Sequence, residues 1–244
     1  MLSQLTFAKA PLKIFWISKH PAKVFKEKKM ELNKYIDHTL LKPNAVESEI
    51  ITLCKEAKDY HFASVCVNPC NVALVKKELA GSDVMTCSVI GFPFGTQTTA
   101  VKCSETEQAI NDGAHEIDMV INIGKLLEGN TSYVEKEIAQ LASICHAKKA
   151  HLKVIVETCY LSEKDVANVC AAVENAGADF IKTSTGYGSR GASLEDIALF
   201  KKYLKKDTKI KASGGIRNRE DALKYIDAGC TRIGTSSGIK IING

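Results

Sequence analysis

Two lysines interrupt apolar runs of the kind that form buried strands. Lys182 lies in Phe180-Ile-Lys-Thr-Ser-Thr-Gly186, and Lys211 lies in Lys209-Ile-Lys-Ala-Ser-Gly-Gly215. A buried ammonium is unfavourable unless an opposite charge pairs with it or it loses its proton. A lysine amine without that proton is a nucleophile that forms an imine with a carbonyl compound. We therefore expect Lys182, which small polar residues follow, to be a Schiff-base nucleophile.

Attack on a carbonyl at neutral pH requires an unusual lysine. The ordinary pKa of the amine is about 10.4, and lowering it toward 7 corresponds to roughly 4 kcal/mol. Desolvation supplies part of this shift, and a nearby cation supplies more. Lys211, in a strand further along the chain, is the candidate for that cation. Its alternative role is a lysine that extends to solvent at the mouth of the site.

A carboxylate lies in equally apolar surroundings. Asp118 occurs in Glu116-Ile-Asp-Met-Val-Ile-Asn122. A neighbouring lysine would keep it ionised, and beside an imine it could relay protons through water. The alternative is a salt bridge that only holds strands together. For Lys153, in Leu152-Lys-Val-Ile-Val-Glu157, we expect a strand-end position that faces the helices or solvent.

Eight short apolar runs must position these residues, and stretches of helical period separate them. Several runs are apolar throughout, as in parallel strands that are covered on both faces. The predicted strands are Tyr35–Leu41, Ala63–Val67, Met85–Phe92, Glu116–Asn122, Leu152–Thr158, Asp179–Thr183, Lys209–Ser213 and Arg232–Thr235.

The helix candidates carry boundary signals. Ser162-Glu-Lys-Asp165 and Ser193-Leu-Glu-Asp196 have the spacing of capping boxes. Gly177 and Gly229 stand where a left-handed residue ends a helix. The clearest apolar stripes are Val46, Ile50, Leu53, Cys54 and Ala57, and then Val166, Val169, Cys170 and Val173.

An internal repeat places three candidates at equivalent positions. Gly113-Ala-His-Glu-Ile117, Gly177-Ala-Asp-Phe-Ile181 and Gly229-Cys-Thr-Arg-Ile233 each begin at a predicted helix end. Because side chains alternate along a strand, equal offsets predict that residues five positions after each glycine face the same way, into a barrel. These residues are Asp118, Lys182 and Gly234.

The repeating units predict an α/β protein with a (β/α)8 TIM barrel, a fold that occupies about 250 residues. A doubly wound sheet is the rival, but it gives no reason for eight evenly spaced strands. The first strand-helix turn also lacks Gly-x-Gly-x-x-Gly. We predict a single barrel domain over residues 31–244, preceded by a flexible, lysine-rich extension over residues 1–30.

Composition narrows the function classes. Seven lysines and one glutamate give residues 1–29 a charge of +6, which leaves −1 for the rest of a chain whose formal charge is +5. The predicted domain therefore lacks the basic face of a nucleic-acid binder. The nine cysteines show no paired metal-ligand spacing, so we expect thiols in a reducing compartment and no metal. Without a signal-peptide core or a membrane span, we expect a cytoplasmic protein.

Glycine-rich segments follow the last two predicted strands. They are Gly214-Gly215 and Gly234-Thr-Ser-Ser-Gly238. Barrels often bind phosphate at this place through loop amides and a short extra helix. We expect Ser236 and Ser237 to cap that helix, which Ile239–Ile242 would form, and to offer hydroxyl groups.

Together these motifs resemble the class I deoxyribose-phosphate aldolase family. The resemblance covers about Tyr35 to Ser237, and the motifs follow one another in the family's order. They are Ile36-Asp-His-Thr-Leu40, Val65-Cys-Val-Asn-Pro69, Gly91-Phe-Pro93, Glu116-Ile-Asp-Met-Val120, Lys153-Val-Ile-Val-Glu157, Phe180–Gly186, Lys211-Ala-Ser-Gly-Gly-Ile-Arg217 and Arg232-Ile-Gly-Thr-Ser-Ser237.

The resemblance implies reversible cleavage of 2-deoxy-D-ribose 5-phosphate to D-glyceraldehyde 3-phosphate and acetaldehyde, without a cofactor. It implies an imine on Lys182 and a proton relay through Asp118 and Lys211. Asp37 and Thr39, at the mouth of the first strand, would hold sugar hydroxyls or a water, and Cys66 would lie near the substrate. Further substrate contacts would come from Thr185 and, for the phosphate, from Gly186, Gly214, Gly215, Gly234, Ser236 and Ser237.

Two departures from the family pattern bear on rate and affinity. Tyr187 stands where some members have a lysine, so Arg217 or Arg190 would have to supply charge to the phosphate. Some members also end in a longer tail with a helpful tyrosine, whereas this chain ends at Gly244.

Two other functions remain open on the sequence. One is another Schiff-base aldolase that acts on a ketose phosphate or a keto acid. The other is a non-catalytic barrel that binds a sugar phosphate, although phosphate binding alone needs neither buried lysine. The sequence leaves the oligomeric state open and is compatible with a homo-oligomer.

Overall fold

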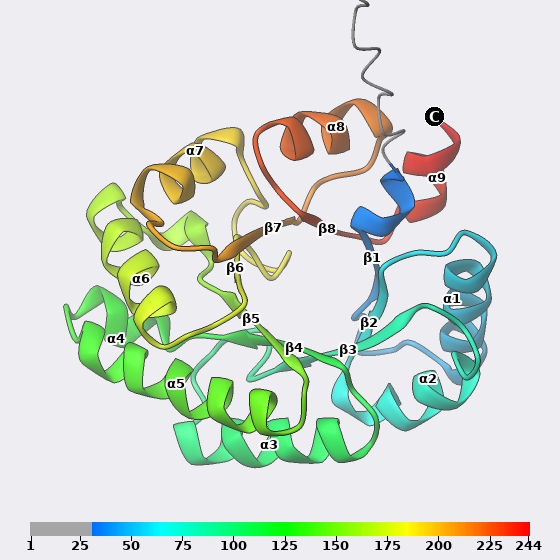
Figure 1. The fold of residues 1–244 in the computed structure, drawn as a ribbon, viewed down its shortest axis with the longest axis horizontal. Coiled ribbons are helices and arrows are strands. Elements are labelled where there is room, and N and C mark those ends of the chain that lie inside the picture. Colours follow the sequence, from blue (N-terminus) through cyan, green and yellow to red (C-terminus); the bar gives the residue numbers. More distant parts are fainter. Residues whose placement is uncertain (1–30) are drawn as a thin grey trace, which may run out of the picture. The chain divides into compact units, whose positions relative to one another are not determined.

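The computed structural model describes residues 31–244. Eight parallel strands close into a barrel in the order β1 to β8, and helices surround it (Figure 1). The predicted (β/α)8 barrel is therefore confirmed. The strands are β1 (Ile36–Leu40), β2 (Ser64–Val67), β3 (Met85–Ile90), β4 (Glu116–Val120), β5 (His151–Ile155), β6 (Phe180–Lys182), β7 (Lys209–Ser213) and β8 (Arg232–Thr235).

The helices bury the outward side chains of the strands. Val65, Ile117 and Ile181, for example, have no exposed surface. The α-helices are α1 (Glu47–Asp59), α2 (Val72–Glu78), α3 (Thr99–Asn111), α4 (Ile123–Leu127), α5 (Thr131–Ala147), α6 (Glu163–Asn175), α7 (Leu194–Tyr203), α8 (Arg219–Asp227) and α9 (Gly238–Asn243), and the 3₁₀ turns are η1 (Leu32–Tyr35), η2 (Pro69–Asn71) and η3 (Thr158–Tyr160). In residues 31–244, no helix combines the length and the apolarity that crossing a membrane demands.

The boundary signals of the helices are largely confirmed. Ser162 and Ser193 cap α6 and α7 in capping boxes with Asp165 and Asp196. Gly177 and Gly229 follow the helix ends with φ values of 75° and 111°. Val46 is an exception, because it is the exposed N-cap of α1 and not part of its buried stripe.

Several predicted strands are longer than the observed ones. Ile121 and Val156 lie beyond the ends of β4 and β5, yet both are fully buried. Glu157 adopts a left-handed backbone with φ 53° and ψ 67°, which is incompatible with an extended strand. Apolar character therefore continues into buried loops at the carboxyl ends of the strands. The predicted extension over residues 1–30 lies outside the described residues.

The interior of the barrel consists of three layers of four residues. Strand register and alternation assign them, with even-numbered strands supplying the lower and upper layers and odd-numbered strands the middle layer. Branched apolar residues usually fill such layers, but here ionisable side chains dominate. The lower layer is Ser64, Glu116, Phe180 and Arg232, the middle layer is Asp37, Cys87, Lys153 and Lys211, and the upper layer is Cys66, Asp118, Lys182 and Gly234.

Candidate active site

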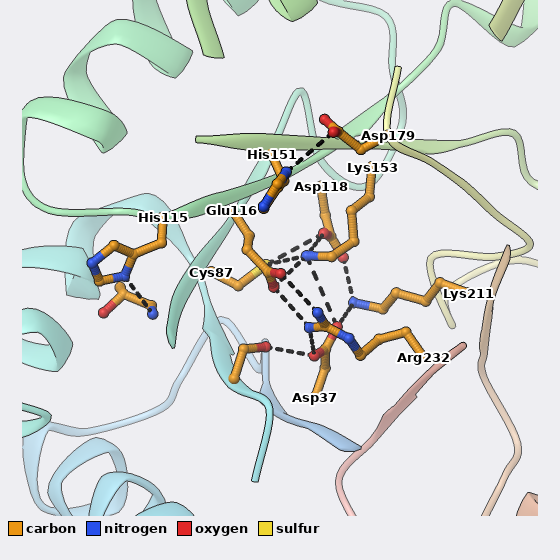
Figure 2. A network of polar contacts seen from close by, with 12 residues as sticks. Asp37, Cys87, His115, Glu116, Asp118, His151, Lys153, Asp179, Lys211 and Arg232 are labelled. Carbon is orange, nitrogen blue, oxygen red and sulfur yellow. Dashed lines mark hydrogen bonds and ion pairs between the residues drawn. The ribbon is translucent and has the colours of Figure 1, made fainter. Parts of the chain in front are cut away.

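The carboxylate of Asp118 is shared by three lysine amines. Its Oδ2 atom lies 2.8 Å from Nζ of Lys182 and 2.7 Å from Nζ of Lys211. Its Oδ1 atom lies 2.9 Å from Nζ of Lys153 (Figure 2). Burial raises the pKa of Asp118, but the three lysines outweigh burial and hold this pKa well below its ordinary value. The predicted trio of Lys182, Lys211 and Asp118 therefore lies together at the upper end of the barrel.

The repeat predicted a common inward direction for Asp118, Lys182 and Gly234, and the structure confirms it. All three belong to the upper layer. A Cβ atom added to Gly234 would lie 2.9 Å from Cβ of Ser213 and 3.1 Å from Cε of Lys211. Glycine at this position therefore leaves the space that the Lys211 side chain occupies.

Lys211 is held between two carboxylates. Its Nζ atom is 2.5 Å from Oδ2 of Asp37 and 2.7 Å from Oδ2 of Asp118. Burial lowers the pKa of Lys211, but Asp118 and Asp37 raise it further, so the pKa lies well above its ordinary value. Lys211 is therefore a buried amine that favours its charged form beside Lys182, and its alternative role at the solvent boundary is wrong.

The expectation that Lys153 faces the helices or solvent is also wrong. Its side chain is fully buried inside the barrel, where Nζ lies 2.6 Å from Oε2 of Glu116. Burial lowers the pKa of Lys153, but the carboxylates of Asp118 and Glu116 raise it well above its ordinary value. The prediction overlooked the alternation of side chains along the strand. Because Leu152 and Val154 face outward, Lys153 must lie on the inner face.

Asp37 lies deeper than expected. It was placed with Thr39 at the mouth of β1, but it is fully buried in the middle layer. Ser64 Oγ donates a hydrogen bond of 2.6 Å to Asp37 Oδ1. Burial raises the pKa of Asp37, but Arg232 and Lys211 outweigh it and lower this pKa. Thr39 and Leu40, at the end of β1, line the cavity at the mouth of the barrel.

Arg232 and Glu116 complete the lower part of the network, and neither was a candidate. Arg232 Nη1 lies 2.6 Å from Asp37 Oδ1, and Nη2 lies 2.9 Å from Glu116 Oε1 (Figure 2). The two carboxylates satisfy the fork of the guanidinium in a buried site. Charged residues at the start of β4 and β8 were the available signal, but a strand start is also a common place for solvent-exposed charges.

The network is balanced without a charge on Lys182. The carboxylates of Asp37, Glu116 and Asp118 face three other cations in the described barrel interior, namely Lys153, Lys211 and Arg232. Lys182 is a further amine that joins this network through Asp118. An unprotonated lysine amine is the form that attacks a carbonyl.

A cavity of about 290 Å³ opens above this network at the carboxyl ends of the strands. Lys182, only 3% exposed, forms part of its wall. Asp37, Cys66, Asp118, Lys211 and Ser237 do not line it. The other predicted site residues do, namely Thr39, Thr185, Gly186, Gly214, Gly215, Gly234 and Ser236.

Cys66 lies in the upper layer and is fully buried beside Cys87. A hydrogen bond with Cys87 lowers the pKa of Cys66 below its ordinary value. The ligand atoms of Cys66, Cys87 and Asp118 lie within 4.8 Å of one another, which by distance alone suits a metal ion. However, the Asp118 carboxylate already contacts three amines, so this donor set fits a further cation poorly.

The two serines after β8 differ from the expectation. Ser237 is the N-cap of α9, but its side chain makes no capping hydrogen bond. Its backbone N–H instead donates to Thr235 Oγ1 at 2.9 Å. Ser236 precedes the cap and lines the cavity. The predicted capping role is therefore wrong for Ser237, because the Thr235 side chain organises this turn.

The cationic residues near Tyr187 differ in whether they line the cavity. Arg190 is bound to Asp196 through contacts of 2.6 and 2.9 Å and is therefore unavailable to a phosphate. Arg217 lines the cavity, and so does Lys42, which was not a candidate. Tyr187 crosses the mouth and donates a hydrogen bond of 2.9 Å to the carbonyl of Leu41.

Comparisons with known proteins agree with this geometry. A model of the DeoC/LacD family aldolase matches residues 32–243. The deoxyribose-phosphate aldolase of Treponema denticola is 70% identical over 215 residues, which cover 88% of this chain and 100% of that protein. The enzyme of the same name from Clostridium novyi is 51% identical and is covered to 96%. A solved tetrameric deoxyribose phosphate aldolase from Aeropyrum pernix is 33% identical, with a TM-score of 0.81 over 87% of this chain and 89% of that one.

Proposed function

The chain belongs to the DeoC/LacD family of aldolases, and from this we infer that it is a deoxyribose-phosphate aldolase. It reversibly cleaves 2-deoxy-D-ribose 5-phosphate to D-glyceraldehyde 3-phosphate and acetaldehyde. One observation carries the link to the site: the Lys182 amine borders the cavity and shares the Asp118 carboxylate with Lys211. The proposed nucleophile, a carboxylate and a second amine are thus joined by direct contacts through Asp118.

We propose that Lys182 is the nucleophile. Its neutral amine attacks the aldehyde carbon C1 of the open-chain sugar phosphate, and loss of water gives a protonated imine. A base then removes the proton of the C3 hydroxyl, the C2–C3 bond breaks, and its electron pair enters the iminium to form an enamine. Glyceraldehyde 3-phosphate leaves, C2 takes up a proton, and hydrolysis of the imine releases acetaldehyde and the free amine.

Asp118 and Lys211 are proposed to move the protons of these steps through water. Asp118 contacts both lysines, so it can accept and donate protons while the carbinolamine is converted to the imine. Asp37 binds Lys211 and Arg232 in the depth of the barrel. We therefore propose that Asp37 acts on the reaction through Lys211. The family resemblance had instead implied a direct contact between Asp37 and the sugar hydroxyls.

Thr39 is proposed to border the reacting end of the substrate. It lines the cavity, and its hydroxyl donates to the carbonyl of Asp37 at 2.8 Å, which leaves lone pairs for a sugar hydroxyl or a water. Cys66 is proposed to lie near the substrate but behind the cavity wall, where it is fully buried, without a required proton transfer.

The phosphate is proposed to bind at the glycine-rich end of the cavity. Backbone amides of Gly186, Gly214, Gly215 and Gly234 and the residues Ser236 and Ser237 would donate hydrogen bonds, as in other barrels. Lys42 and Arg217 line the same cavity. We assign to these two residues the charge that a lysine at position 187 would otherwise supply.

We also propose that the protein forms a homo-oligomer in the cytoplasm. The Aeropyrum pernix neighbour is described as tetrameric, which supports assembly of a related chain. All nine cysteines lie among the described residues as free thiols, which supports a reducing compartment. Light scattering of the purified protein tests the assembly.

The division into an extension of residues 1–30 and a barrel of residues 31–244 stays a prediction.

Substrate cleavage tests the reaction against its two rivals. A coupled assay for glyceraldehyde 3-phosphate should register rapid cleavage of 2-deoxyribose 5-phosphate and none of fructose 1,6-bisphosphate. Preference for the ketose phosphate would assign another aldolase activity. Calorimetric binding of the deoxy sugar phosphate without release of aldehyde over hours would instead indicate a non-catalytic binding protein.

A further inference from the structure

Glu157 combines a buried carboxylate with a left-handed backbone. Its side chain is 2% exposed, its φ is 53°, and no lysine or arginine of residues 31–244 forms an ion pair with it. A residue with a side chain is unfavourable in this backbone region and persists there only where its surroundings fix it. The proposed reaction assigns no role to this residue.

The contacts of Glu157 all lead to the loop that follows Lys182. The backbone N–H of Thr185 donates to both carboxylate oxygens, at 3.3 and 3.1 Å. The hydroxyl of Thr185 also donates to Oε2 of Glu157. The same hydroxyl oxygen accepts the backbone N–H of Tyr187 at 2.9 Å. One carboxylate thus organises both N–H groups that flank Gly186.

Backbone bonds on either side of Glu157 join the same two segments. Val156 N–H donates to the carbonyl of Lys182 at 3.1 Å, and Thr158 N–H donates to the carbonyl of Thr183 at 2.9 Å. Gly188 packs so closely that an added Cβ would lie 2.7 Å from Sγ of Cys159 and 3.2 Å from Cδ of Glu157. The left-handed turn at Glu157 therefore directs its carboxylate into the loop, where the regular ladder has ended.

The ordered loop forms one wall of the substrate cavity. Thr185, Gly186 and Tyr187 line it, and Tyr187 reaches across to the carbonyl of Leu41. Because Thr185 gives its hydroxyl proton to Glu157, that hydroxyl can only accept a hydrogen bond from a ligand. The Gly186 amide and the Tyr187 side chain are the parts of the loop that remain for the substrate.

We propose that Glu157 is a positioning residue that fixes the 185–187 loop through Thr185 and so preforms the phosphate end of the cavity beside Lys182. The inference rests on the proposed aldolase function and deepens it, since it assigns a residue to phosphate specificity that does not touch the substrate. Loss of Glu157 should therefore raise KM for a phosphorylated substrate and leave KM for an unphosphorylated one nearly unchanged.

Glu157→Gln is the principal variant. The amide has one acceptor oxygen for two donors, and its NH₂ group faces donors of Thr185. Because the loop would lose hydrogen bonds that hold both N–H groups beside Gly186, we expect KM for 2-deoxyribose 5-phosphate to rise by about tenfold or more. KM for unphosphorylated 2-deoxyribose should stay within about twofold, and acetaldehyde should still be trapped on Lys182.

Three further variants separate the effect of losing the carboxylate on KM from an effect on folding. Glu157→Gly accepts the left-handed backbone but lacks the carboxylate, so it should show the same rise in KM without a greater loss of Tm than Glu157→Gln. Thr185→Val removes the hydroxyl and should raise KM for the phosphorylated substrate, whereas Thr185→Ser should restore it. If Glu157→Gln fails to fold, the Thr185 pair decides the question.

Glu174→Gln is the matched control. Glu174 is another buried carboxylate that accepts backbone N–H groups, from Lys205 and Lys206 at 2.8 and 2.6 Å, and it does not line the cavity. This variant should lower Tm and leave both KM values unchanged. Equal rises of KM for both sugars in Glu157→Gln, or a Tm loss with neither KM changed, would overturn the role of Glu157. Absence of trapping in the unmodified protein would instead refute the proposed aldolase function.

Discussion

Nζ of Lys153 lies 2.9 Å from Oδ1 of Asp118, on the carboxylate oxygen that Lys182 and Lys211 leave free. Lys153 also reaches Glu116 at 2.6 Å, so it joins the upper layer of the barrel to the lower one. Lys153 therefore links the Asp118 carboxylate beside Lys182 to Glu116, which does not line the cavity.

Replacing Lys153 by Met should disturb both stability and imine formation. Glu116 and Asp118 would lose a buried partner, which typically costs about 3–5 kcal/mol. The Asp118 carboxylate beside Lys182 would also lose the contact that holds its Oδ1 atom, so acetaldehyde trapping on Lys182 should become slower. Urea unfolding and the rate of acetaldehyde trapping measure the two effects.

A double variant provides the control for Lys153. Lys153→Met combined with Glu116→Gln removes one positive and one negative charge, so its loss of stability should be smaller than that of Lys153→Met alone. The exposed Lys164→Met should change neither stability nor the trapping rate. A trapping rate of Lys153→Met equal to that of the unmodified protein would contradict a role of Lys153 in holding Asp118.

Lys211→Met should lower kcat about a hundredfold, because the variant lacks the buried amine that takes part in the proposed proton relay beside Lys182. Steady-state cleavage of 2-deoxyribose 5-phosphate measures this change. Lys209→Met is the matched control, since Lys209 lies on the same strand but is exposed, and kcat should be retained. Similar kcat values for the two variants would remove Lys211 from the mechanism.

Lys42→Ala and Arg217→Ala should each raise KM for the phosphorylated substrate by about tenfold, because each removes a cation from the cavity wall. KM for unphosphorylated 2-deoxyribose should remain unchanged. Arg190→Ala is the comparison, because its partner is Asp196 and it should mainly affect stability. A phosphate-specific effect of Arg190→Ala alone would reverse the assignment.

Stability should decrease toward low pH. Asp37 and Asp118 have pKa values below the ordinary 3.8 in the folded protein, because the buried cations outweigh the opposing effect of burial. The unfolded chain therefore binds protons first as the pH falls, and the stabilisation is present above the ordinary value and is lost as the pH falls below it. Urea unfolding should give a lower free energy at pH 3 than at pH 6. Equal values would show that these carboxylates contribute no net stabilisation.

Stability should also decrease at high pH, for the opposite reason. Lys153 and Lys211 have pKa values above the ordinary 10.5, since Asp118 and its neighbours outweigh burial. Their contribution is complete below the ordinary value and is lost as the pH rises above it. The two effects together predict a plateau of the unfolding free energy between about pH 5 and pH 10.

The sequence was sufficient for the fold because each strand-helix unit carries local signals. The repeat around Gly113, Gly177 and Gly229 even predicted that Asp118, Lys182 and Gly234 face the same interior. Lys182 and Asp118 were visible because a charged residue in an apolar run conflicts with its surroundings. Such conflicts are often found at functional sites.

Other parts of the site depend on tertiary structure that no local pattern reveals. The depth of Asp37 follows from the register of β1 against β2 and β8. The contact of Tyr187 with Leu41 joins residues 146 positions apart. Glu157 gave no signal at all, because its left-handed backbone and its partner Thr185 are known only from the structure.

Reductive trapping tests the central claim most directly. The protein is incubated with acetaldehyde and borohydride and then digested with trypsin. An adduct on Lys182 blocks cleavage there, so the modified peptide should span Asp165 to Arg190, in which Lys182 is the sole internal site. We predict the adduct on this peptide and its absence in Lys182→Met. An adduct on another lysine, or no adduct at all, would contradict the account.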